Sequence, residues 1–475
     1  MNPGLDDVRR RLLIGAGALV SGCAWSVPGV GLGTPPPELL FDDLERRTFS
    51  FFWDTANPVN GLVPDRWPSR SACSIAATGF GLTALPIGVT RGFISRAQAR
   101  DRALATLRFF ANAPQGPHPS ATAGHRGFFY HFLDMQSGLR AQESELSTVD
   151  TALLLAGMLF CQAYFDQTDA REVELRQLVD LVTERVEWTW IQVRAPLIAM
   201  GWTPEAGFIS ADWRGYDEGM IVYLLALGST THAVDPAAWA AWTATYNLSW
   251  GVFHGYEHLG FAPLFGHQYS HVWVDFRGIF DSYMRTRGID YFENSRRATY
   301  AQRAYATANP KKWQGYDDLV WGLTACDGPA NVTRPYLGAS RRFRAYSARG
   351  AGILSFPDDG TIAPTAAASS LPFAPEIVIP SVQEMARRHG AQIYARYGFV
   401  DAFNPSFEYA APLAYGRREQ GFGWIDTDYI GIDQGPILAM GANHRSALVW
   451  NAMRRSPTLV RGLRRAGFSG GWLSA

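Results

Sequence analysis

The sequence predicts an all-α fold, an α/α toroid in which an inner ring of helices is wrapped by an outer ring. Apolar residues recur at helical spacing, as in Leu175, Val179 and Val182. Other segments, such as 151–160 and 221–227, are apolar nearly all round and must be covered on every face. Signals for strands are few. A plain helical solenoid is the alternative, but the sequence contains no repeat of fixed period.

Residues 1–23 have the features of an export signal. Three arginines at 9–11 precede the apolar run 12–20, which is too short to span a bilayer. The motif Val20-Ser21-Gly22-Cys23 resembles a bacterial lipoprotein processing box with Cys23 as the acylated residue, and the adjacent arginines resemble a twin-arginine signal. An ordinary cleaved signal and an uncleaved anchor are the alternatives. We expect a periplasmic protein, lipid-anchored to the outer membrane.

Residues 24–37 are rich in Gly and Pro and are typical of a linker, which leaves 38–475 as one catalytic domain. Ser95 is a candidate N-cap, and Asp235-Pro236 is a favourable helix start. A short hairpin is expected around 353–365. Start signals and apolar spacing together predict helices over 38–56, 95–111, 147–165, 170–191, 218–227, 237–246, 268–284, 290–308, 377–388 and 436–454.

The composition excludes some classes of partner. Lys and Arg number 43, as do Asp and Glu, so the chain carries no overall positive field that would hold nucleic acid. Without Cys23, the cysteines Cys73, Cys161 and Cys326 allow at most one disulfide and lack zinc or redox spacing. We expect a monomer without a cofactor, whose membrane contact is made only through the lipid anchor.

The stretch 255–329 mixes aromatic rings with histidines and carboxylates at high density. Flat rings cover the apolar faces of sugars while polar side chains bond their hydroxyls, so the mixture suits an oligo- or polysaccharide substrate. The alternative is that these rings only fill a large core. The polar residues that interrupt the rings favour the sugar cleft.

The best catalytic candidate lies in the segment 213–219, where Asp217 and Glu218 stand between aromatics and a helix start. Burial against Trp213 and Tyr216 raises a carboxyl pKa, whereas a helix N-terminus lowers it. We assign Glu218 as the proton donor and expect Asp217 to cap the helix or bind substrate. The alternative is that both acids only cap.

Two further acidic segments are candidates. Glu145 and Asp150 precede an apolar helix, although Ser147 and Asp150 have capping-box spacing and Asp150 has helix capping as its alternative. Asp433 lies just before a helix that Pro436 can begin, so capping is again the alternative.

Histidines repeat at i and i+4 in His267 and His271, with Asp275 one turn further, so all three would share one helix face. This spacing is compatible with a metal site. However, Gln268 stands where a zinc protease needs its Glu base, so we expect no metal and predict hydroxyl-binding groups or a hydrogen-bonded helix pair. The segment Gly79-Phe80-Gly81 lacks the features of a dinucleotide loop.

Nine blocks spread over about residues 41–450 resemble the bacterial glucoamylase-like family that includes glycoside hydrolase family 144. They are FFWDTANPVNGLVPDR, SIAATGFGLTALPIGVTRG, SELSTVDTALLLAG, YDEGMIVYLLALGS, PLFGHQYSHVWVDFRG, DYFENSRRATYAQRAY, WGLTACDGP, YGFVDAFNPS and DYIGIDQGP. The resemblance implies an (α/α)6 toroid and hydrolysis of β-1,2-glucan, usually endo-acting with inversion, with some relatives releasing sophorose. The older glucoamylase label implies α-glucan cleavage instead.

By position, Glu218 matches an acidic residue of that family, and Asp150 and Asp433 fall in segments that match other cleft acids. We expect Glu218 to donate the proton and Asp150 or Asp433 to help activate water. The rival functions are a glycan-binding lipoprotein without catalysis, a retaining transglycosylase and an α-glucan enzyme. The expected substrate-binding residues are Trp213, Tyr216, Asp217, Glu145, His267, Gln268, His271, Asp275, Glu293 and Asp327.

Overall fold

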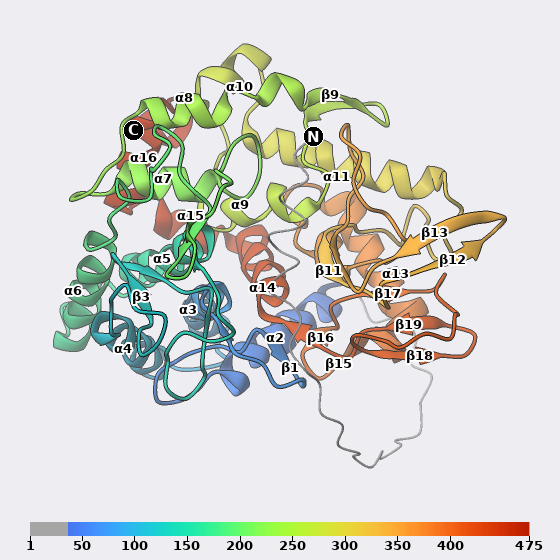
Figure 1. Cartoon of the computed structure of the whole chain (residues 1–475), viewed down its shortest axis with the longest axis horizontal. Helices are drawn as coiled ribbons and strands as arrows, with labels where there is room; N and C mark the ends of the chain where they lie inside the picture. The colour runs from blue at the N-terminus through green and yellow to red at the C-terminus, as the bar shows by residue number, and fades with distance from the viewer. Residues whose placement is uncertain (1–36, 475) are drawn as a thin grey trace.

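The computed structural model describes residues 37–474, and over this range the chain is mainly helical (Figure 1). The prediction of a mainly helical fold is confirmed. Four buried helices lie side by side at the centre: α14 (Gly431–Ser446) packs on α3 (Ile75–Thr90), α3 on α5 (Thr148–Tyr164), and α5 on α7 (Met220–Gly228). Three of them, α3, α5 and α7, are apolar nearly all round, as helices covered on every face must be.

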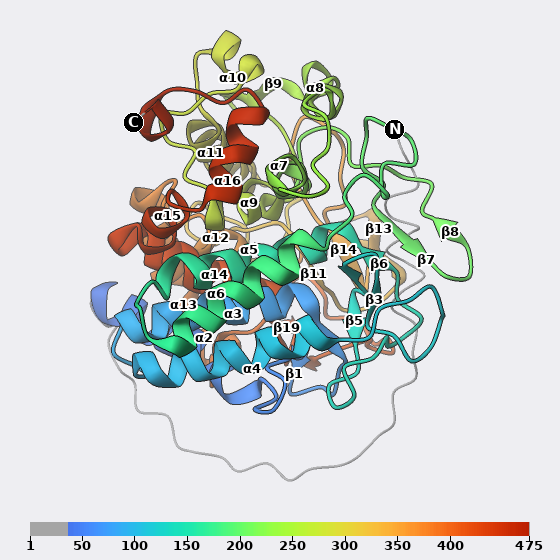
Figure 2. The same ribbon diagram turned by 90° about the vertical axis from the view of Figure 1, so that its left-hand side faces the viewer.

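Outer helices cover this central row, giving a two-layer arrangement. In Figure 2, α4 (Arg96–Asn112) and α6 (Ala170–Glu184) lie across the outside of α3 and α5, and they also pack on each other. Helix α2 (Pro37–Thr55) covers α14, and α16 (Pro457–Arg465) covers α7. Ser95 caps α4 in a complete capping box, as its sequence predicts.

Shorter helices and a second pair of long ones complete the fold. The long ones are α11 (Tyr291–Ala308), capped by Asp290, and α13 (Pro375–Ile393), which packs on α12 (Pro364–Ala368). The remaining helical elements are α8 (Ala237–Thr243), α9 (Tyr269–Trp273), α10 (Ser282–Arg287), α15 (Leu448–Met453), η1 (Tyr246–Leu248), η2 (Leu264–His267) and η3 (Gly471–Ser474).

The strands are two to five residues long and form small antiparallel pairs or triplets. They are β1 (Arg66–Trp67), β2 (Cys73–Ser74), β3 (Gly124–His125), β4 (Phe128–Phe129), β5 (Phe132–Leu133), β6 (Leu146–Ser147), β7 (Gly201–Thr203), β8 (Gly207–Phe208), β9 (Trp250–Phe253), β10 (Tyr256–Leu259), β11 (Ala325–Asp327), β12 (Val332–Tyr336), β13 (Ala339–Phe343), β14 (Tyr346–Ala348), β15 (Tyr394–Ala395), β16 (Gly398–Phe399), β17 (Phe403–Asn404), β18 (Arg417–Glu419), β19 (Gly423–Ile425) and β20 (Tyr429–Ile430).

Glycine lets the two central helices α3 and α5 approach closely. A Cβ atom on Gly79 would lie 2.4 Å from the carbonyl oxygen of Leu153, and one on Gly157 would lie 2.1 Å from the carbonyl oxygen of Gly79. Neither distance is compatible with a side chain, so the pair requires glycine on both helices. Gly79 therefore serves helix packing, in line with the rejection of a dinucleotide loop at this segment.

The structure corrects several predicted boundaries. The helix expected over 268–284 is broken, because Val274 takes an extended conformation and the next helix begins only at Ser282. The helix expected over 436–454 begins five residues earlier and is divided at Ala447, whose φ is 53°. The helix expected over 170–191 ends at Glu184.

The prediction of a hairpin around 353–365 is wrong. The longest hairpin is the β12–β13 pair, and the 353–365 segment contributes only an isolated bridge from Ile362 to Phe403 before α12 begins. The expected export signal at 1–23, its proposed acylation residue Cys23 and most of the expected linker at 24–37 lie outside the described residues. Within 37–474, no helix combines the length and the apolar character needed to cross a bilayer.

Candidate active site

A cavity of about 190 Å³ opens where several central helices begin. It meets the N-terminal ends of α5, α7 and α14, and the residues of η2 and α9 that face them. Helix N-termini carry partial positive charge and favour anionic groups. Five carboxylates line this cavity, from segments far apart in the chain: Asp65, Glu145, Asp150, Glu218 and Asp433.

Glu218 lies two residues before α7 begins, and both Glu218 and Trp213 line the cavity. Trp213 is fixed from two sides: its indole N–H donates to Thr148 Oγ1 at 2.8 Å, and its carbonyl accepts from the Tyr223 hydroxyl at 2.9 Å. Glu218 is only 3% exposed. A buried acid in a cavity that a fixed aromatic ring also lines has the setting of a proton donor.

Asp217, by contrast, has a structural role. Its Oδ1 accepts the backbone N–H of Gly219 at 2.8 Å, which closes the turn before α7. It does not line the cavity. The Asp217 side chain therefore stabilises the turn that precedes α7, whose N-cap Gly219 has no side-chain cap hydrogen bond.

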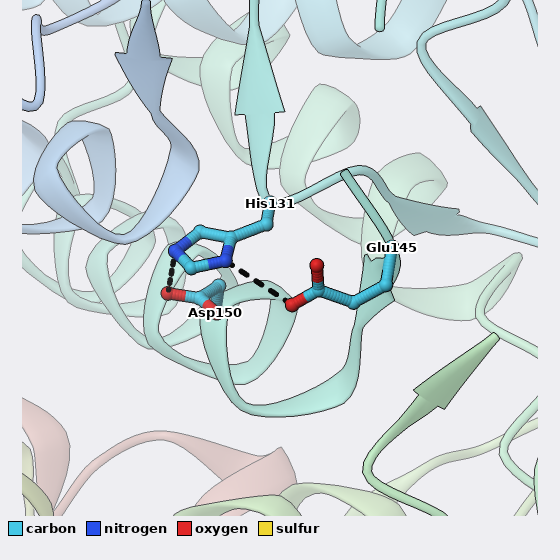
Figure 3. Close-up of side chains that lie close together, drawn as sticks. All are labelled: His131, Glu145 and Asp150. Carbon is cyan, nitrogen blue, oxygen red and sulfur yellow. Dashed lines mark hydrogen bonds and ion pairs between the residues drawn. The ribbon is translucent and has the colours of Figure 1, made fainter. Parts of the chain in front are cut away.

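His131 lies between Glu145 and Asp150 on the cavity wall (Figure 3). Its Nδ1 is 3.1 Å from Glu145 Oε1, and its Nε2 is 3.6 Å from Asp150 Oδ1. An isolated bridge from Tyr130 to Leu146 and the hydrogen bond from the N–H of His131 to the carbonyl of Glu145, 2.9 Å long, set this register.

The charge of His131 follows from these neighbours. Burial disfavours its protonated form, but the carboxylates of Asp150 and Glu145 outweigh that effect and raise the pKa of His131 to about 9. The imidazolium ring also stacks on Phe132, with ring centroids 4.0 Å apart. At neutral pH a protonated His131 therefore lies between the carboxyl groups of Asp150 and Glu145.

Asp150 combines helix capping with a place in the cavity. The Ser147 hydroxyl accepts the Asp150 backbone N–H at 3.2 Å and donates to Asp150 Oδ2. This leaves Oδ1 facing His131. The two interpretations of Asp150 from the sequence are therefore compatible.

Asp433 reaches the cavity from the first turn of α14. The β1–β20 pair places Arg66 opposite Ile430, so Arg66 and Asp433 share one wall. Burial raises the pKa of Asp433 to about 7, and the negative charge of Asp327 contributes in the same direction. Asp433 therefore holds a proton for part of the time at neutral pH.

Behind this wall lie three more buried acids, Asp327, Asp401 and Asp426. Burial and mutual repulsion raise the pKa of Asp401 and of Asp426 well above the usual value. Arg66 Nη1 pairs with Asp327 Oδ2 at 2.6 Å. Asp327, an expected substrate-binding residue, thus sits behind a residue that lines the cavity.

The histidine segment is buried away from the cavity, apart from Tyr269. His267 bonds the Phe261 carbonyl at 3.1 Å, His271 lies 3.1 Å from Ser295 Oγ, and Gln268 donates to Ala366 O and Ser370 Oγ. Burial lowers the pKa of His271 to about 3. These contacts fit the expected hydrogen-bonded helix pairing, although His267, His271 and Asp275 occupy η2, α9 and a loop instead of one helix face.

Three other expected substrate-binding residues have structural contacts. Tyr216 is buried and stacks on Tyr291. Asp275 pairs with Arg277 at 2.8 Å and also with Arg454. Glu293 pairs with Arg297 at 2.8 Å, one turn further along α11. None of the three lines the cavity.

Sequence reasoning missed several lining residues. His131 is an isolated histidine, Asp65 lies in a bend, and Arg66 begins the two-residue strand β1, so no periodic pattern marks them. Tyr269 and Tyr346 also line the cavity. A hint for Asp65 and Arg66 existed, because they end the first block of the family resemblance.

A family model described as "Putative glucoamylase" matches residues 210–457, just over half of this 475-residue chain. An exo β-1,2-glucooligosaccharide sophorohydrolase (non-reducing end) from Parabacteroides distasonis is 27% identical over 461 residues, covering 90% of this chain and 58% of that protein. The chain thus spans little more than half the length of this curated relative.

Solved structures of similar proteins also match most of this chain. A putative glucoamylase from Bacteroides uniformis is 28% identical with a TM-score of 0.80, covering 93% of this chain and 100% of that chain. An endo-β-1,2-glucanase from Chitinophaga pinensis, in complex with sophorotriose and glucose, is 27% identical with a TM-score of 0.78, covering 92% and 100%. The resemblance expected from the sequence is confirmed.

Proposed function

The chain belongs to the putative glucoamylase family, and from this premise we propose that it is a glycoside hydrolase that cleaves β-1,2-glucan. The observation that carries the proposal is the convergence of Asp65, Glu145, Asp150, Glu218 and Asp433 around one cavity with aromatic walls. The β-1,2-glucan-cleaving relatives support the choice of substrate. The proposed fold is the closed (α/α)6 toroid of which α14, α3, α5 and α7 form adjacent inner members.

The proposed reaction inverts the anomeric carbon. Glu218 gives its proton to the glycosidic oxygen as the C1–O bond breaks, while a carboxylate removes a proton from the water that attacks C1 from the opposite face. The products are two shorter sugars, and the pair of acids exchanges protons with solvent before the next turnover. Inverting pairs are typically separated by roughly 6.5 to 9.5 Å to leave room for that water.

Asp150 is our first choice for the base, because it lines the cavity and its Oδ1 lies 3.6 Å from Nε2 of His131, which can hold it in position. Asp433 is our second choice, because its raised pKa leaves it partly protonated near pH 7. Trp213 is the proposed platform for a sugar ring.

A substrate and product assay tests the proposal. Purified protein is offered β-1,2-glucan and starch separately, and the anomeric form of the new reducing end is followed by NMR. We expect sugars only from β-1,2-glucan, first in the inverted form. Release only from starch would assign an α-glucan enzyme, retention with new linkages would assign a transglycosylase, and tight binding without cleavage would assign a glycan-binding protein. The product lengths distinguish endo from exo action.

We further propose that the protein is exported, acylated at Cys23 and anchored as a monomer in the outer membrane facing the periplasm. The arginines and the Val20–Cys23 box support this. Cell fractionation of the wild type and a Cys23→Ala variant, with fatty-acid labelling, tests it. Equal labelling of both proteins would contradict the anchor.

A further inference from the structure

A buried triad of aspartates lies behind the cavity wall. Asp327 ends β11, Asp401 lies between β16 and β17, and Asp426 follows β19, so three separate segments bring them together. They are 0%, 2% and 0% exposed. One ligand atom from each lies within 4.8 Å of the other two.

One oxygen of each carboxylate is held by a donor. Asp327 Oδ2 accepts from Arg66 Nη1 at 2.6 Å, and Asp401 Oδ2 accepts from the Asp327 backbone N–H at 2.7 Å. Asp426 Oδ1 accepts the backbone N–H groups of Thr427 and Asp428 at 2.6 and 3.0 Å. These bonds fix the orientation of all three side chains.

The second oxygen of each carboxylate accepts no hydrogen bond from the described part of the chain. These atoms are Asp327 Oδ1, Asp401 Oδ1 and Asp426 Oδ2, and all are buried. Buried acceptors are rarely left without a donor, because the lost hydration is not replaced. Three such atoms in one cluster indicate that something else satisfies them.

The charges around the triad also indicate that a positively charged partner is missing. Arg66 pairs with Asp327 and lies 3.6 Å from Asp428, but it also faces Asp65. Among residues 37–474 no other cation pairs with any member of the triad. One guanidinium cannot balance several buried carboxylates, and uncompensated buried charge is costly.

We propose that the free oxygens of Asp327, Asp401 and Asp426 coordinate a calcium ion. Carboxylate oxygens without sulfur or nitrogen ligands select a hard cation. Calcium–oxygen bonds of about 2.3–2.6 Å let one ion span oxygens up to about 5 Å apart, which accommodates the spacing of the triad. Arg66 and Asp433, which line the cavity, mark the side from which the ion enters. A calcium ion bound here would revise the expectation of a protein without a metal.

Shared protons are the competing way to satisfy these oxygens. Asp327 lies within hydrogen-bond reach of Asp426, and Asp401 within reach of Asp433. A proton held between two carboxyl groups would bind no metal. Metal binding by the wild-type protein therefore decides between the two.

Terbium luminescence provides the readout, because Tb³⁺ substitutes for Ca²⁺ and is sensitised by nearby tryptophan. Buried Trp424 precedes Asp426 by two residues. In chelator-treated full-length protein we expect a saturable signal for one site, reversed by Ca²⁺ and not by Mg²⁺. We also expect about one calcium per chain by elemental analysis after calcium loading and dialysis.

Variants locate the ion. Asp426→Asn should weaken Tb³⁺ binding by more than about tenfold, since it removes one charged ligand. Asp150→Asn is the matched control, because it lies in the other acidic cluster and should leave the Tb³⁺ affinity unchanged. If Asp426→Asn does not fold, the wild-type titration and the calcium content still decide the question.

The proposal is overturned if the wild type shows neither saturable Tb³⁺ binding nor retained calcium, which is the result shared protons predict. It is also overturned if Asp426→Asn binds as the wild type does, or if Asp150→Asn abolishes the signal. Both readouts are independent of turnover, so either outcome leaves the proposed hydrolysis untouched.

Discussion

Nε2 of His131 lies 3.6 Å from Oδ1 of Asp150, at the point where α5 begins on the cavity wall. The contact joins an isolated histidine to an acid that also accepts the hydroxyl of its own capping serine. It gives the proposed base a cationic neighbour without a metal. Two of the predictions below rest on it.

Replacing His131 by leucine should lower kcat. Without the imidazole, Glu145 and Asp150 lose the partner that lies between them and holds both carboxyl groups, so the position of Asp150 shifts. Misplacement of this kind costs roughly 100-fold. Steady-state kinetics on β-1,2-glucan measure it, with the exposed His118→Leu as the control. Unchanged kcat in His131→Leu would show that Asp150 needs no such neighbour.

The stabilisation that His131 contributes should depend on pH. Its pKa is raised from 6.5 to about 9 in the folded protein, so its contribution is fully present below about pH 6.5 and is lost as the pH rises through about 9. The unfolding free energies of the wild type and His131→Leu, measured with urea, should therefore differ more near about pH 6 than near about pH 10. A difference in unfolding free energy that stays constant from about pH 6 to pH 10 would contradict a charged His131.

Gly79→Ala should destabilise the fold by about 1–3 kcal/mol. The new Cβ would meet the Leu153 carbonyl at 2.4 Å and force α3 and α5 apart. Gly390→Ala, in helix α13, is the matched control, because the nearest atom to its Cβ lies 4.0 Å away. The control should be neutral or stabilised by up to about 1 kcal/mol. Chemical denaturation measures both, and equal stability of the two variants would refute the packing argument.

Much of the helical frame was predictable, for local reasons. Amphipathic spacing located α6, and the capping residues Ser95 and Asp290 stand where α4 and α11 begin. Helix α3 escaped prediction, because glycines and Pro86 lower its intrinsic propensity while its neighbours stabilise it from every side. The predicted 268–284 helix failed for the converse reason, since favourable spacing did not reveal the extended Val274.

The candidate site was predictable where acids stand beside helix starts. Glu218, Asp150 and Asp433 all begin inner helices, and the sequence marks such positions. His131 and Arg66 were not predictable in this way, because strand pairs between distant segments bring them to the cavity. For His267, His271 and Gln268 the sequence left two expectations open, hydroxyl binding and a hydrogen-bonded helix pairing, and the contacts in the structure fit the second. Their polar character serves buried hydrogen bonds, which sequence spacing alone does not distinguish from ligand binding.

The turnover of Glu218→Gln on β-1,2-glucan tests the central claim most directly. The amide keeps the shape of the side chain but has no proton to donate, so kcat should fall by about 10²- to 10⁴-fold while sugar binding is retained. Glu293→Gln, which changes an acid paired with Arg297 away from the cavity, should keep the wild-type rate. Wild-type turnover by Glu218→Gln would contradict the account, because the cavity would then not be where the glycosidic bond is broken.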